Sequence, residues 1–170
     1  MPKPTLDALD FKIIRELQRD GRTTNQDLAD RIGLSPSPCL RRVRQLERAN
    51  VITRYVALIN PQPIGLTVTA FVRVRLDRQD DRHLAAFERA ISAFSEVMEC
   101  YLMTGECDYQ LRILVPSLAD FEEFLRQKLT RIEGVSQVTT SFTLRPVVYR
   151  TALPVGEDDR PPSPSPLEWA

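Results

Sequence analysis

Arginine and small polar side chains share one face of a helix that the sequence predicts between Pro36 and Arg48. With 3.6 residues per turn, the side opposite the apolar residues carries Ser37, Pro38, Arg41, Arg42 and Gln45. Guanidinium groups in such a row can bond guanine edges or phosphate oxygens of DNA. A solvated helix face is the simpler interpretation for an isolated helix, so the neighbouring elements decide between the two.

Individual contacts can be assigned on the hypothesis of DNA binding. We expect Arg41 or Arg42 to read guanine through paired hydrogen bonds, and Arg44 and Arg48 to hold phosphates. The short polar side chains suited to phosphate or other polar contacts are Thr24, Asn25, Ser35 and Ser37.

The stretch from Thr23 to Asn50 predicts two helices joined by a tight turn. Thr24 can cap the first helix, and Gly33 ends it. Ser35 can cap the second helix, with Pro36 at its first position, where the missing N–H costs nothing. The residues expected in the core are Leu28, Ala29, Ile32, Leu40, Val43 and Leu46. An earlier helix, which Thr5 or Asp7 begins and Asp20 ends, completes a three-helix unit of the helix-turn-helix type.

The charge distribution supports a DNA partner for this unit. The formal net charge of the 170 residues is zero. Residues 1–60 nevertheless hold 11 of the 23 Lys and Arg and only 7 of the 23 Asp and Glu, so they carry +4 and the rest −4. A basic first part indicates an anion-binding module joined to a second module.

Other classes of protein are disfavoured. His83 is the only histidine, and with no nucleophile or phosphate-loop motif we expect no enzyme and no cofactor. The three cysteines (Cys39, Cys100 and Cys107) lack metal spacing, and Cys39 is interpreted as a small buried hydrophobe. With no apolar run long enough for a membrane span, we expect a cytoplasmic protein.

The second half of the chain alternates strands and helices in the order β-α-β-β-α-β. The expected elements are strands over 67–76, 97–104, 109–115 and 135–149, and helices over 81–94 and 117–131. This order is that of a ferredoxin-like sheet with helices on one face only. Because the other face needs a cover, we expect a homodimer, with Phe71, Tyr101 and Phe142 on the open face.

The fold class is therefore α+β. We expect a helix-turn-helix domain over 1–60, a linker over 61–66, a ferredoxin-like domain over 67–153 and a disordered Pro-rich tail over 154–170. Residues 51–59 are rich in β-formers, so they form either a wing or a strand that pairs with a second copy.

The turn between the two middle strands has two interpretations. Gly105 and Asp108 are typical of a plain β-turn, which the sequence alone favours. Alternatively, free amides and the Asp108 carboxylate could hold a small zwitterion, with Asp108 accepting its ammonium group.

Three segments together resemble one family. They are LDALDFKIIRELQRDGR (6–22), GLSPSPCLRRVRQLE (33–47) with VITRYVALINP (51–61), and ECYLMTGECDYQLRILVPS (99–117). Over about residues 5–153 the chain resembles the Lrp/AsnC transcription regulators, with a GxxDY turn at Gly105.

The resemblance implies a winged helix-turn-helix domain and a ligand-sensing αβ-sandwich domain of the RAM type. It implies dimers that assemble into tetramers or octamers and control genes of amino-acid metabolism. Leucine or another small amino acid would bind between dimers around the turn. The positions implied for this effector are Thr104, Gly105, Glu106, Cys107, Asp108 and Tyr109.

Three other functions remain open at this point. An architectural, DNA-wrapping protein would use the same fold with little sequence preference. A metabolite-binding module would have lost DNA binding, and a small ferredoxin-like enzyme would need a catalytic set that the sequence does not provide.

Overall fold

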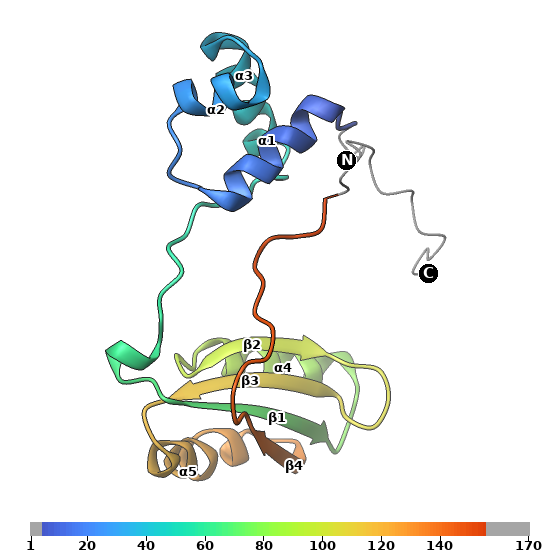
Figure 1. Ribbon diagram of the computed structural model, residues 1–170. Helices are drawn as coiled ribbons and strands as arrows, with labels where there is room; N and C mark the ends of the chain where they lie inside the picture. The colour runs from blue at the N-terminus through green and yellow to red at the C-terminus, as the bar shows by residue number, and fades with distance from the viewer. Residues whose placement is uncertain (1–4, 156–170) are drawn as a thin grey trace. The chain divides into compact units, whose positions relative to one another are not determined.

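The computed structural model describes residues 5–155, which divide into two compact units (Figure 1). Of these residues, the first unit comprises residues 5–58 and 148–155, whereas Ile59–Val147 form the second. The predicted tail lies outside the described residues from residue 156 onward.

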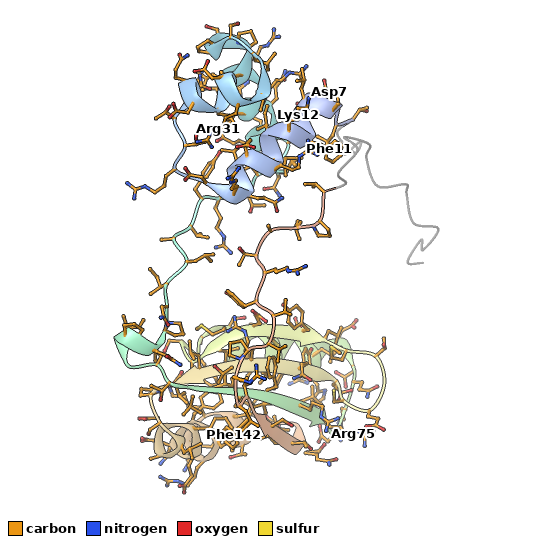
Figure 2. The ribbon with its side chains drawn as sticks, in the orientation of Figure 1. Asp7, Phe11, Lys12, Arg31, Arg75 and Phe142 are labelled. Atoms are coloured by element: carbon orange, nitrogen blue, oxygen red, sulfur yellow. The ribbon has the colours of Figure 1, made fainter. Side chains whose placement is uncertain are left out.

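Three helices form the first unit: α1 (Ala8–Arg19), α2 (Asn25–Ile32) and α3 (Pro36–Arg48). Asp7 caps α1 at its first turn (Figure 2). Its side chain and that of Asp10 each accept the other residue's backbone N–H. Thr24 caps α2 as predicted, because its hydroxyl accepts the Asp27 N–H. Gly33 ends α2 with φ of 74°, a conformation in which glycine has no Cβ strain. The predicted helix-turn-helix is therefore confirmed.

The buried side of α3 differs from the prediction at one residue. Cys39, Val43 and Leu46 are buried at helical spacing, but Leu40 is 37% exposed. The buried stripe begins at Cys39, and the next residue is rotated by about 100° away from it. Burial raises the pKa of the Cys39 thiol, which fits its prediction as a small hydrophobe in the core.

The second unit is a four-stranded antiparallel sheet with two helices. Its strands lie in the order β2-β3-β1-β4, which is the ferredoxin-like arrangement expected from the chain order. A one-turn 3-10 helix, Gln62–Ile64, precedes the sheet. The elements are β1 (Val68–Leu76), α4 (Asp81–Ser92), β2 (Val97–Leu102), β3 (Tyr109–Val115), α5 (Leu118–Gln127), a 3-10 turn (Leu129–Arg131) and β4 (Val135–Phe142).

Among residues 5–155, helices cover only one face of the sheet. Along β1, Ala70, Val72, Val74 and Leu76 are buried under the helices while the residues between them are exposed. Phe71 (41% exposed) and Tyr101 (54%) lie on the open face as predicted. The prediction for Phe142 is wrong: it pairs with Ala70 on the covered face, and its ring contacts Phe121 of α5.

One segment predicted as a wing or as a strand to a second copy is unpaired within the described chain, and one predicted strand is shorter. Residues 53–60 form no strand, because no described segment pairs with them, and Tyr55, Val56, Leu58 and Ile59 are exposed. β4 ends at Phe142 instead of Tyr149. The last bond of its ladder joins the Thr143 N–H to the Thr69 carbonyl, next to the start of β1, and Pro146 then has no N–H to donate.

Candidate functional site

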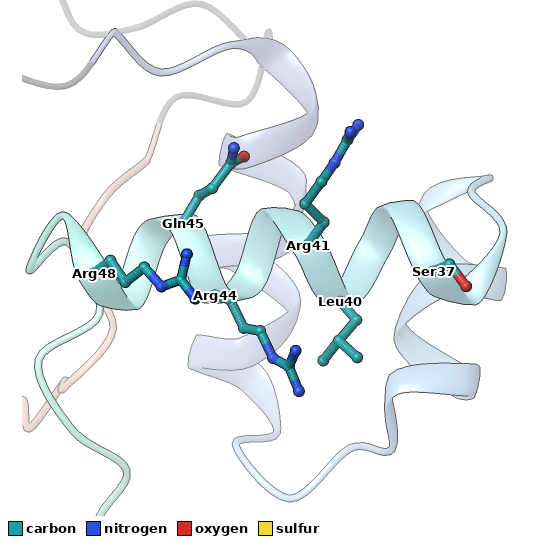
Figure 3. Close-up of a pocket in the computed structure, with 6 residues that line it drawn as sticks. All are labelled: Ser37, Leu40, Arg41, Arg44, Gln45 and Arg48. Carbon is teal, nitrogen blue, oxygen red and sulfur yellow. The ribbon is translucent and has the colours of Figure 1, made fainter.

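A basic groove runs along the exposed side of α3 (Figure 3). We call it the α3 groove, and its lining consists of Ser37, Leu40, Arg41, Arg44, Gln45 and Arg48. Helical spacing explains the row, since each lining residue lies three or four positions from another lining residue. Among the residues that the structure describes, no carboxylate pairs with Arg41, Arg44 or Arg48. These guanidinium groups therefore present unneutralised positive charge to solvent.

Arg42 does not belong to this groove, which corrects the sequence prediction. Its Nη1 atom lies 2.8 Å from both Asp7 Oδ2 and Asp10 Oδ1, at the start of α1. The hydrogen bond to Asp10 and the neighbouring Asp7 raise the pKa of Arg42. The Arg42 guanidinium therefore links α3 to the start of α1 through two ion pairs. Because these ion pairs engage it, Arg42 is not free to bond a base.

The smaller polar residues of the predicted interface divide into two groups. Thr24 caps α2, and Asn25 donates its side-chain N–H to the Pro36 carbonyl at 2.9 Å, so both hold the helix-turn-helix together. Ser35 and Ser37 are exposed at the start of α3. The Ser35 hydroxyl makes no cap hydrogen bond, contrary to the prediction, partly because half-buried Pro38 at the third position has no N–H.

The turn between β2 and β3 exposes its first residues. Thr104, Gly105 and Glu106 are exposed, Cys107 is half-buried, and Gly105 has φ of 113°. An L-residue would be strained in that conformation, which accounts for the glycine. The exposed residues are thus available to a ligand or to a neighbouring copy.

The last two residues of the turn are part of the core. Asp108 is 8% exposed, and its carboxylate accepts the Leu76 N–H and the Gln79 amide, both at 2.7 Å. Tyr109 is buried against Phe87, and its hydroxyl donates to Glu88 at 2.9 Å. Burial, and then that bond, raise the pKa of Tyr109. Asp108 and Tyr109 thus bond other groups of the described chain, which is what the plain-turn interpretation predicts.

A hollow on the open face of the sheet lies beside this turn and was not predicted. Glu106 and Cys107 line it together with Arg73, Arg75, Gln137 and Thr139. Strand register explains the grouping, since Arg73 pairs with Thr139 and Arg75 with Gln137. Period-2 alternation in the sequence places both arginines on one face, but no sequence pattern gives the register with β4.

Other kinds of site find no support in the described part of the chain. Residues 5–155 contain no cluster of three His, Cys, Asp or Glu side chains arranged as metal ligands. No helix within the same range is both long and apolar enough to cross a membrane.

Known proteins share both units. Residues 6–53 match the winged helix-turn-helix DNA-binding family, and residues 69–153 match the Lrp/AsnC ligand binding domain. The chain is 46% identical over 142 residues to the leucine-responsive regulatory protein of Rhizobium meliloti, covering 84% of this chain and 91% of that one. It is 42% identical to the Bkd operon transcriptional regulator of Pseudomonas aeruginosa, covering 88% and 98%.

Solved structures agree in fold. A transcriptional regulator from Neisseria meningitidis in complex with L-Met superposes with a TM-score of 0.84 at 39% identity, covering 88% of this chain and 97% of that one. An AsnC family transcriptional regulator from Agrobacterium tumefaciens gives 0.83, also at 39% identity, covering 88% and 97%.

A helix-turn-helix unit joined to a ligand-binding ferredoxin-like unit defines a DNA-binding transcription regulator and not an enzyme. The chain belongs to the Lrp/AsnC family.

Proposed function

We propose that the chain controls genes of amino-acid metabolism by placing α3 in the major groove of specific DNA sites, and that an amino acid modulates this binding. The observation that carries the DNA-binding part is the α3 groove, where Arg41, Arg44 and Arg48 lack acidic partners among the described residues. A relative named as a leucine-responsive regulatory protein supports the link to amino acids, and one named as an operon transcriptional regulator supports the control of genes. We propose a cytoplasmic location, because relatives of the chain come from bacteria, whose DNA lies in the cytoplasm.

Within the groove we assign separate roles to the arginines. Arg41 lies in the first half of α3, the part of a recognition helix that meets base edges, and can bond a guanine through two N–H groups. Arg44 and Arg48 lie further along the helix and contact phosphates. Ser35, Ser37 and Gln45 supply shorter polar contacts around them.

The phosphate assignment predicts a change in salt dependence. Arg44→Ala and Arg48→Ala should each weaken binding to duplexes of any sequence and reduce the slope of log K against log salt by about 1. Electrophoretic mobility or fluorescence anisotropy measured at several salt concentrations tests this. Arg126→Ala, on an exposed position of α5, is the matched control and should leave the slope unchanged. An unchanged slope in both α3 variants would contradict the assignment.

The effector part of the proposal concerns the turn and the hollow beside it. A free amino acid carries one carboxylate and one ammonium group, and the hollow offers arginines (Arg73, Arg75) next to the Glu106 carboxylate. Asp108 does not line the hollow but lies two residues after Glu106 in the same turn. Each oxygen of Asp108 already accepts one hydrogen bond but has a further lone pair for an ammonium. The regulator structure solved with L-Met supports an amino acid as the ligand class.

Thermal-shift measurements with each of the twenty amino acids test the effector site. A ligand present at 100 times its Kd stabilises the protein by about 2.7 kcal/mol, so at least one amino acid should raise Tm by several degrees. Asp108→Asn keeps an oxygen for the Leu76 N–H but removes the charge, and should abolish the shift.

Asp81→Asn provides the control for the loss of a carboxylate, since Asp81 is exposed in the first turn of α4. It should respond like the wild type. A full ligand response in Asp108→Asn would remove Asp108 from the effector site, and no response to any amino acid in the wild type would contradict the ligand class.

We also propose that the chain works as a homodimer or a larger assembly. No described residue outside the sheet covers the face on which Phe71 and Tyr101 are exposed, and a second copy provides a matching surface. A ligand bound at the edge of such an interface changes DNA binding only if its affinity differs between assemblies.

A further inference from the structure

Leu40 is a large apolar side chain exposed within the basic α3 groove. It is 37% exposed and lines the groove with Ser37 and Arg44, which are three residues before it and four residues after it (Figure 3). The other lining residues are all polar or charged. Leu40 is therefore the only large apolar residue among those that line the groove.

Folding of the helical unit does not explain this leucine. The buried cluster of the unit takes Cys39, Val43 and Leu46 from α3, and Leu40 is neither in it nor among the partly buried residues packed against it. Helix propensity does not require it either, because alanine would stabilise an exposed helical position at least as well. The side chain is therefore available for an external contact.

We propose that Leu40 contacts the C5-methyl group of thymine in the major groove and so contributes to sequence specificity. The inference rests on the proposed DNA binding by α3. Thymine displays a methyl group in the major groove, and an apolar side chain recognises it by contact. Arginine, serine and glutamine recognise donors and acceptors on base edges, so the polar residues of the groove do not supply this discrimination.

The position of Leu40 in the helix fits this role. It lies five residues into α3, which begins at Pro36, and adjoins Arg41. The N-terminal residues of a recognition helix approach base edges most closely. A leucine side chain is shorter than arginine, so it can contact a base only from such a position, whereas Arg48 reaches the backbone from the far end.

Replacement of thymine by deoxyuridine isolates the proposed contact, because it removes the C5-methyl group and keeps base pairing. A duplex that the full-length protein enriches from a random library serves as the probe. Each thymine is then replaced in turn, and affinities are measured for the wild type, Leu40→Ala and Leu40→Met. At one position the wild type should lose about four-fold in affinity, the value expected for one buried methyl group.

The comparison between variants decides the proposal. Leu40→Ala should bind the unmodified duplex more weakly and lose its sensitivity to deoxyuridine at that position, whereas Leu40→Met should retain most of it. Circular dichroism melts of both variants should match the wild type. Equal deoxyuridine effects in the wild type and Leu40→Ala, or none in either, would overturn the contact while leaving DNA binding through the arginines intact. A wild-type protein that enriches no sequence would contradict the proposed function itself.

Discussion

At the scale of single residues, Arg41 and Arg42 are neighbours with different tasks. The Arg42 guanidinium bridges two carboxylates of α1, while Arg41 has no acidic partner in the part of the chain that the structure describes. One step along a helix rotates a side chain by about 100°, which is enough to move it from solvent to a neighbouring helix. Stability and recognition are thus separated between adjacent positions.

Because Arg42 stabilises the fold and Arg41 contacts DNA, their alanine substitutions should affect different properties. Arg42→Ala should lower the free energy of unfolding by about 1 kcal/mol, since a partly exposed ion pair contributes little more, and should leave the ratio of specific to random DNA affinity unchanged. Arg41→Ala should leave stability within about 0.5 kcal/mol and lower that ratio. Urea unfolding and DNA titration of both proteins measure this. Equal loss of DNA specificity in both variants would contradict the purely structural role assigned to Arg42.

Helical periodicity predicted most of the basic face but not these partners. A helical wheel places Arg41, Arg42 and Gln45 on one side, yet it carries no information on where Asp7 and Asp10 lie. The same limit applies to Leu40, since a wheel does not tell which of two adjacent apolar residues, Cys39 or Leu40, the other helices cover. The same limit applies to Asp108. The turn that contains it was predictable, but its hydrogen bond from Leu76 depends on a strand distant in the sequence.

At the scale of elements, pairing partners determine which β-rich segments become strands. β1 was predictable from alternation and has neighbours on both sides. Residues 53–60 have β-propensity but no neighbour within the described chain, and β4 ends near the point where β1 begins. Propensity is a local property, whereas a ladder needs a second strand. The predicted order of strands and helices was therefore correct, whereas β4 ends at Phe142 and not at the predicted residue 149.

Charge pairs join the edge strand β2 to its neighbour and predict a pH dependence. The hydrogen bond from Arg112 to Glu99 lowers the pKa of Glu99 in the folded chain. A carboxyl group with a lowered folded pKa stabilises the fold above its unfolded pKa of about 4.3 and loses that contribution as pH falls through the folded value. The urea midpoint should therefore fall as the pH decreases from about 5 to 3.

Glu99→Gln tests the source of this fall. The variant should show a smaller decrease over the same pH range, while Glu123→Gln, at an exposed position of α5, should follow the wild type. Midpoints from circular dichroism at a series of pH values provide the comparison. A decrease in Glu99→Gln as large as that of the wild type would assign the effect to other carboxylates.

At the scale of the whole molecule, the chain passes between its two units twice. It leaves the helical unit after Leu58 and returns to it at Val148, where Gln18 bonds both the N–H and the carbonyl of Leu153. Charge and composition predicted two domains, and two family models match the two parts of the chain. The return was not predictable, because the Gln18 contact joins residues 135 positions apart.

The most direct test of the account compares a duplex enriched by the protein with a random duplex of equal length. At fixed salt, the wild type should bind the enriched duplex at least about 1,000-fold more tightly. Arg41→Ala should lose about 10- to 100-fold on the enriched duplex and little on the random one, as expected for one lost bidentate base contact. Equal affinity of the wild type for both duplexes would contradict sequence-specific reading by α3 and would support even coating of DNA.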